Sequence, residues 1–168
     1  MDFLEGYFNI IPLLAPVDNV AAETATAYID LKLAQDACFL VNNGLVTSAT
    51  ATDLVAVTLE AATAVTATEA AIIYNYRLSA AVGANTWGDI ATAAATGVEL
   101  DPATHDNMAL LIDANPAKVQ AQKANARYVR VRLGTAADMG AHLVGVLAIV
   151  KPRYKQDTMA SATAAASA

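Results

Sequence analysis

The feature that most constrains the fold is an alternation of apolar and polar side chains with a period of two residues. It is clearest at positions 128–133, where valine or leucine alternates with tyrosine or arginine. This period places the apolar residues on one face of a strand. Similar patterns cover positions 27–33, 54–60 and 72–78, and compact apolar runs cover 37–41, 108–112 and 141–150. Turn signals such as Asn42–Gly44 separate about eight short strands. The chain is therefore predicted to be all-β, an antiparallel β-sandwich of jelly-roll type.

The pattern predicts three segments. Residues 1–23 form an N-terminal arm, residues 24–155 form the β-sandwich domain, and residues 156–168 form a low-complexity Ala/Ser/Thr tail. The tail lacks large apolar side chains, so we expect it to be flexible unless a partner holds it. Inside the sandwich, Pro116–Lys123 is predicted to be a short helix, because Asn115 can cap it and proline suits its first turn.

The arm carries large apolar side chains at a spacing typical of a helix of about two turns, which Pro12 and Pro16 would end. These side chains are Phe3, Leu4, Tyr7, Phe8 and Ile11. Two interpretations remain open. The segment can fold back over the chain's own sandwich, or it can dock on another subunit. Because burial of each such side chain is worth roughly 1.5–3 kcal/mol, we expect residues 1–11 to lie at a contact with a neighbouring subunit or another protein of the assembly.

Charge limits the classes of partner. The net charge is −6 and the pI about 4.7, which argues against nucleic acid as a partner. Arg127, Arg130 and Arg132 form the one dense basic cluster of the sequence. They are interpreted as salt-bridge partners of a neighbouring subunit or of this chain's own acids, with phosphate binding as the alternative. Only 15% of the residues are charged, so we expect the protein to self-associate, most simply as a homotrimer.

No residue pattern indicates catalysis. Cys38 is the single cysteine and lies in an apolar run, which favours a buried thiol over a nucleophile. Asp101, His105, Asp106 and Asp113 could ligate a hard cation, but their spacing is equally that of an acidic turn. We therefore expect no enzymatic activity and no cofactor or metal. Trp87 beside Gly88 is interpreted as a plug at the end of the sandwich, with sugar stacking as the alternative.

Two further features bear on location. The N-terminus carries Asp2 and Glu5 where a secretory signal needs positive charge. The apolar runs are too short for a membrane-spanning helix. The chain is therefore expected to be a soluble protein made in the cytoplasm, with no membrane partner.

The succession of strands in the C-terminal half resembles the capsid decoration (cement) proteins of tailed bacteriophages. The resemblance covers residues 27–154 and lies mainly in Asp106–Asp113, Arg127–Leu133 and Ala148–Tyr154. It implies a β-sandwich on the exterior of a virion, without catalysis, that binds the major capsid protein and assembles as homotrimers. A neck or tail component of the same virion, and a carbohydrate-binding jelly roll, are the alternatives. The candidate contact residues are Phe3, Leu4, Tyr7, Phe8, Ile11, Arg130, Arg132, Lys151, Arg153 and Tyr154.

Overall fold

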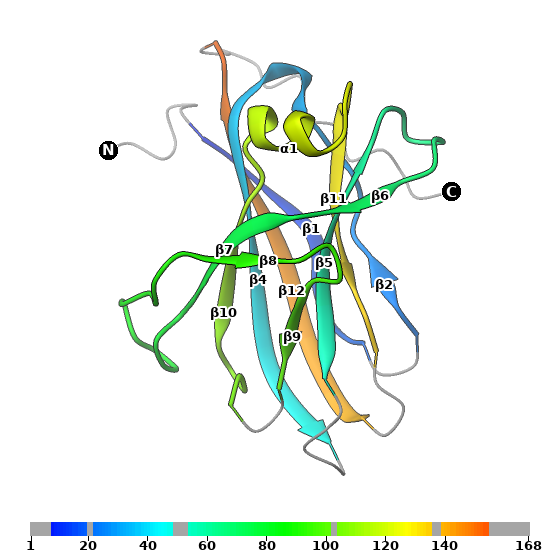
Figure 1. The fold of residues 1–168 in the computed structure, drawn as a ribbon. Coiled ribbons are helices and arrows are strands. Elements are labelled where there is room, and N and C mark those ends of the chain that lie inside the picture. The colour runs from blue at the N-terminus through cyan, green and yellow to red at the C-terminus, as the bar shows by residue number, and fades with distance from the viewer. Residues whose placement is uncertain (1–7, 20–21, 49–53, 102–103, 136–138, 155–168) are drawn as a thin grey trace.

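A computed structural model describes residues 8–19, 22–48, 54–101, 104–135 and 139–154 of the 168-residue chain. These residues form twelve strands, one α-helix and one 3₁₀ turn (Figure 1). All strand pairs are antiparallel, and they divide into two sheets. The predicted all-β class with two antiparallel sheets is confirmed. The predicted C-terminal tail, residues 156–168, and arm residues 1–7 lie outside the described residues.

Sheet A has six strands. Their order across the sheet is β1 (Asn9–Asp18), β12 (Met139–Pro152), β4 (Ala34–Ser48), β10 (Ala109–Asp113), β7 (Tyr74–Leu78) and β8 (Ala91–Ala93). Strands β4 and β12 are the longest and form the middle of this sheet together with β10.

Sheet B is built around β11 (Tyr128–Leu133) and β5 (Val55–Ala62). Its order is β2 (Thr24–Ala25), β11, β5 and β6 (Ala70–Ile72). The short strand β3 (Ile29–Asp30) also pairs with β11, and β9 (Val98–Leu100) also pairs with β5. The 3₁₀ turn Leu31–Leu33 connects β3 to β4, so the alternation predicted for residues 27–33 gives a strand only in its first half.

The core lies between the two sheets and follows from the alternation in the sequence. Val129, Val131 and Leu133 of β11 are fully buried, as predicted, and so are Phe39 and Val41 of β4. Among the described residues Phe39 is the largest fully buried side chain, and most of the others are valine, leucine, isoleucine or alanine. A core of small aliphatic residues permits close approach of the sheets but gives each contact a modest area.

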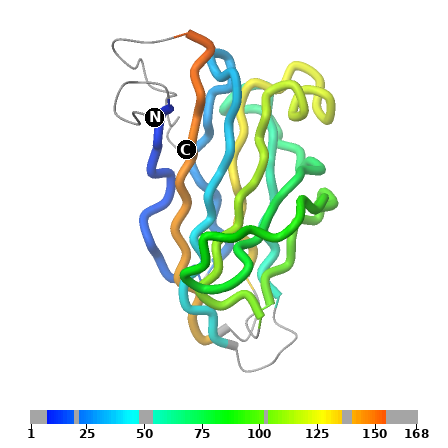
Figure 2. Tube along the Cα trace, turned by 90° about the vertical axis from the view of Figure 1, so that its left-hand side faces the viewer, coloured from blue at the N-terminus to red at the C-terminus, as the bar shows by residue number. Residues whose placement is uncertain are grey.

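The last residues of the helix predicted for the arm, 9–11, belong to a strand, whereas residues 1–7 of that helix lie outside the described residues. Residues 9–18 form β1, which pairs with β12 at one edge of sheet A (Figure 2). Residues 9–18 of the predicted arm thus pair with the chain's own sandwich, which is one of the two interpretations left open for this segment. An edge strand tolerates Pro12 and Pro16, since one side of it needs no hydrogen-bond partner. The pairing with β12 shifts register twice between Pro12 and Val17, which accommodates the prolines.

The turn predicted at Asn42–Gly44 is also absent, because these residues lie inside β4. The pairing of β4 with β12 shifts register between His142 and Val144, opposite this point. A Cβ at Gly44 would lie 3.0 Å from the carbonyl oxygen of Leu143. Glycine is thus needed here for close approach of two strands at a bulge, not for a reversal of the chain.

The predicted helix is confirmed as α1 (Pro116–Gln122), one residue shorter than expected. Asn115 caps it, and its side-chain oxygen accepts a hydrogen bond of 3.0 Å from the amide of Ala117. Pro116 and Val119 are buried, which seats the helix against one end of the sandwich (Figure 1).

The order of the strands has a nested pattern. The first strand pairs with the last, as β1 with β12, and the next pairs inward are β2 and β3 with β11 and then β4 with β10. Inside these pairs, β5 pairs with both β6 and β9, and β7 pairs with β8. Three more pairings, β12 with β4, β11 with β5 and β10 with β7, join these hairpin-like pairs into the two sheets.

Candidate binding surface

The outward face of sheet A is apolar across its central strands. In each central strand the half-buried residues alternate with fully buried ones and therefore lie on the outward face. These half-buried residues are 38 and 40 on β4, 147 and 149 on β12, and 111 on β10. The register places Ile149 beside Cys38, and it places Leu147, Leu40 and Leu111 in one row across three strands. Ile10 on β1 extends this band and is 54% exposed. A sheet face with so many aliphatic side chains is typical of a surface that contacts another protein segment.

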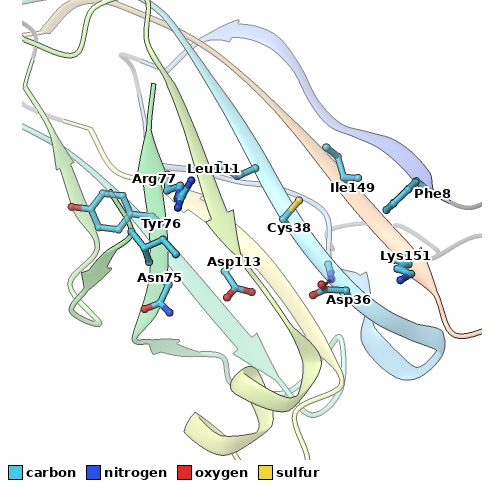
Figure 3. Close-up of a pocket in the computed structure, with 12 residues that line it drawn as sticks. Phe8, Asp36, Cys38, Asn75, Tyr76, Arg77, Leu111, Asp113, Ile149 and Lys151 are labelled. Carbon is cyan, nitrogen blue, oxygen red and sulfur yellow. Dashed lines mark hydrogen bonds between the residues drawn. The ribbon is translucent and has the colours of Figure 1, made fainter. Parts of the chain in front are cut away.

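A groove of about 270 Å³ is hollowed into this face (Figure 3). Cys38, Leu111 and Ile149 form its floor, with Phe8 at one end and Tyr76 at the other. The complete lining is Phe8, Asp36, Ala37, Cys38, Asn75, Tyr76, Arg77, Ile90, Leu111, Asp113, Ile149 and Lys151. The groove thus crosses strands β12, β4, β10 and β7.

Charged side chains of both signs surround the apolar floor. Lys151 lies near Phe8, Arg77 lies at the opposite end, and Asp36 and Asp113 lie between them (Figure 3). Asp113 forms an ion pair with Lys118 of α1. Asp36 accepts a hydrogen bond of 3.1 Å from the side-chain amide of Asn115. The cap of α1 and the helix itself therefore hold the acidic side of the groove in place.

The chemistry of Cys38 is that of an inert thiol. Burial raises its pKa above the ordinary value, and the negative charges of Asp36 and Asp113 raise it further. The thiolate is the nucleophilic form, so a raised pKa leaves little of it at neutral pH. Cys38 was predicted to be buried, but it is half-buried and lies on the floor of the groove. This arrangement supports binding at the groove and provides no activated nucleophile.

The outward face of sheet B has the opposite character. Arg130 on β11 forms ion pairs with Glu60 on β5 and with Glu69. Its guanidinium also lies 4.7 Å from the centre of the Tyr28 ring. Arg132 contacts Glu60 and Glu23. These interactions satisfy the charges within the chain, so the salt-bridge interpretation of the arginine cluster holds for the chain's own acids.

A separate ion pair joins Arg127 to Asp30. Both carboxylate oxygens of Asp30 accept hydrogen bonds from the guanidinium. Burial alone would raise the pKa of Asp30, but these hydrogen bonds and the positive charge of Arg127 lower it overall. All three arginines of the predicted cluster therefore have acidic partners in the same chain, which disfavours the phosphate-binding alternative.

The predicted contact residues do not form one site. Phe8 and Lys151 line the groove on sheet A, whereas Arg130 and Arg132 lie on sheet B. Ile11 is partly buried and packs against the core. The remaining described residues of the set are Arg153, which donates to the carbonyl of Ala34, and Tyr154, which is 71% exposed. Phe3, Leu4 and Tyr7 lie outside the described residues.

Sequence reasoning missed the floor of the groove, although a signal was present. The runs at 37–41, 109–112 and 146–150 are apolar at nearly every position, without the alternation seen in β11. Strands of this composition are apolar on both faces. Such runs in an antiparallel sandwich indicate that the outer face of the sheet is also covered or available for docking.

The remaining sites proposed from the sequence are the acidic turn around His105 and the loop that contains Trp87. His105 Nδ1 accepts a hydrogen bond of 2.8 Å from the Asp101 amide, and an Asp106 carboxylate oxygen accepts one of 2.8 Å from the Val46 amide. In the described parts of the chain no three His, Cys, Asp or Glu side chains gather as metal ligands would. Trp87 is 38% exposed, in a loop whose residues 80–90 are all exposed, so it does not plug the sandwich. The described helix is too short to cross a membrane.

Comparisons of the chain with protein-family models, with curated proteins and with solved structures found no match.

Proposed function

We propose that the protein is a non-catalytic structural component of a tailed-phage virion, a capsid decoration protein that binds the major capsid protein and stabilises the head. The observation that carries the proposal is the contrast between the two sheets. Sheet B turns a charged and internally satisfied face outward, whereas sheet A turns outward an apolar, grooved face. A fold with one such face is suited to packing against another subunit.

The strand order supports a jelly-roll type for the sandwich. A jelly roll is a long antiparallel ribbon of strands rolled into two sheets. Nested pairing of β1 with β12, of β2 and β3 with β11, and of β4 with β10 is what such a ribbon produces. The pairings of β12 with β4 and of β11 with β5 then arise when the ribbon is rolled. Strands β7 and β8 are an addition at the edge of sheet A.

The working form is proposed to be a homotrimer on the exterior of the capsid. A lattice offers many equivalent positions, so weak contacts made by many copies together can hold the shell firmly. Closed symmetric assembly also covers an apolar face that would otherwise remain in water.

Copy number on the particle tests the proposal. Quantitative mass spectrometry of purified virions should find this chain in numbers comparable to the major capsid protein. A variant with Leu111→Glu, on the floor of the groove, should be depleted from particles, whereas Val82→Ser on the exposed loop should be retained. A few copies per particle would indicate a neck or tail component, and absence from virions would refute the proposal.

A carbohydrate-binding module is the second candidate, favoured by the exposure of Trp87. An exposed indole can stack on a sugar ring. A glycan array that gives binding lost on Trp87→Ala, with particle copy number unchanged, would favour this candidate over the decoration role.

A further inference from the structure

We propose that the groove on sheet A receives the N-terminal segment Met1–Tyr7 of a second copy of this chain. The inference rests on the proposed structural role and names the partner at that face. The occupant is argued from the place where the described chain begins, from the length of the segment, and from the charges at the rim of the groove.

The groove fits a mainly apolar occupant whose acidic groups lie at its two basic ends, because the acids between those ends, Asp36 and Asp113, already contact Asn115 and Lys118. Its floor is formed by Cys38, Leu111 and Ile149, and the two ends carry Lys151 and Arg77 (Figure 3). The segment of residues 1–7 carries Met1, Phe3, Leu4 and Tyr7, together with Asp2 and Glu5. Its apolar side chains match the floor, and its two carboxylates match the basic ends.

The segment is also long enough. Seven extended residues span about 23–25 Å. The groove crosses four neighbouring strands, which lie about 4.8 Å apart and so span about 14–15 Å. One segment can therefore cover the floor from β12 to β7 with its ends over the charged rim.

The direction of β1 favours a second copy over the same chain. Asn9 pairs with Val150, only two residues before β12 ends at Pro152. A chain that continues β1 backward from Phe8 therefore leaves the sheet at the end of β12. To enter its own groove, which crosses the strands, the segment would have to turn sharply out of line with β1 directly before Phe8, whose side chain already lies at one end of the groove. An outgoing segment instead reaches a neighbouring copy, and repeated arm-to-groove contacts can close into a ring such as a trimer.

Cys38 is a built-in reporter of occupancy, because it is the only cysteine and lies on the groove floor. The rate at which an uncharged maleimide modifies Cys38 is measured over a range of protein concentrations. The full-length chain should react several-fold more slowly as concentration rises, in step with its mass by light scattering. A chain that lacks residues 1–7, and the full-length variant Phe3→Ser/Tyr7→Ser, should react at the fast rate throughout. Val82→Ser should behave like the wild type.

A mixing experiment separates the two possible sources of the segment. Full-length protein with Cys38 already modified has a blocked groove but keeps a free segment of residues 1–7. The chain that lacks residues 1–7 has an open groove but no such segment. Each should be monomeric alone, and their mixture should associate. If modification is slow at every concentration in a protein that light scattering shows to be monomeric, and becomes fast when residues 1–7 are deleted, the segment lies in its own groove. A rate that is the same with and without residues 1–7 would leave the groove without this occupant. Either result overturns this inference, while the copy number on virions still decides the proposed function.

Discussion

At the scale of single residues, His142 is a buried polar group with only one of its two ring nitrogens hydrogen-bonded among the described residues. Its side chain is fully buried, and Nε2 lies 2.8 Å from the side-chain oxygen of Asn43. Because that oxygen is an acceptor, Nε2 carries a hydrogen and donates it to Asn43. Nδ1 has no hydrogen-bond partner among the described residues. Burial lowers the pKa of His142 below its ordinary value of 6.5, although the charge of Asp18 opposes the shift.

This arrangement predicts loss of stability in mild acid. Below pH 6.5 the unfolded chain binds a proton at residue 142 that the folded chain does not, so the free energy of unfolding falls as pH falls. The slope from this group is at most about 1.4 kcal/mol per pH unit, and the loss ends below the pKa of the folded state. Urea unfolding between pH 7.5 and 5.5 should show it, and His142→Gln, which keeps a donor toward Asn43, should flatten the dependence. An equal slope in both proteins would contradict the assignment to His142.

Tyr74 makes the second prediction at this scale. Its buried hydroxyl belongs to sheet A, but it donates to the carbonyl of Val57 and accepts a hydrogen bond of 3.2 Å from the Val98 amide, both in sheet B. Burial raises the pKa of Tyr74, so the hydroxyl remains protonated. Tyr74→Phe leaves both partners without the hydroxyl and should cost about 1–3 kcal/mol. The midpoint of urea unfolding measures the loss, and Tyr154→Phe, at an exposed position, is the control.

At the scale of elements, the pairing of β11 with β5 depends on its charges. The side chains of Arg130 and Glu60 are only 13% and 9% exposed, so loss of either partner leaves a poorly solvated charge. Arg130→Met should lower the free energy of unfolding by about 3 kcal/mol, which is near the lower limit for breaking a buried ion pair. The effect should not be larger, because Arg132 still lies 3.5 Å from Glu60 and partly compensates its charge. The more exposed pair of Arg127 and Asp30 provides the matched control.

The control substitution Arg127→Met should have a much smaller effect, because water screens that pair. Both variants can be compared by thermal and urea unfolding under the same conditions. Equal effects of the two substitutions would show that burial of the arginine contributes little to the stability of sheet B.

The elements also show what the sequence could and could not predict. Strand β11 was predictable because one of its faces is buried and the other polar, and α1 because its cap is local. Strand β1 was not predictable from the sequence. Pro12 and Pro16 exclude a central strand but not an edge strand, and whether a strand lies at the edge depends on the tertiary structure. Asn42–Gly44 failed for the same reason, because a bulge opposite β12 uses the residues that a turn would use.

The candidate binding surface was harder to predict, because it is assembled from distant strands. Cys38, Leu111 and Ile149 come from three strands and meet only through register. Sequence reasoning assigned such apolar residues to the core by default. The arginines that it proposed as contacts are instead paired with acids from β5 and from the segments before β2 and β6, which no local pattern reveals.

At the scale of the whole molecule, the nested strand order brings the two ends of the described chain together. Asn9 lies beside Val150 on the neighbouring strand. The connection between β7 and β8, by contrast, is an exposed loop at the edge of sheet A. The fold should therefore depend on which strands are paired and not on where the chain begins.

This reasoning predicts that a circular permutant will fold. In this variant a linker of about six residues joins residue 154 to residue 8. Residues 151–154 extend beyond the pairing of Asn9 with Val150, and a linker of this length can span the distance back. New termini are opened in the exposed loop at Gly83. Loops of this kind tolerate new ends because few contacts cross them. The permutant should keep the β-type circular dichroism spectrum and unfold cooperatively, with a modest loss of stability. A second permutant with its ends between Phe39 and Leu40 cuts β4, the strand that joins β12 to β10, and should fail to fold. If the two permutants were equally stable, or if the loop permutant were unfolded, the nested ribbon would not be the unit that determines the fold.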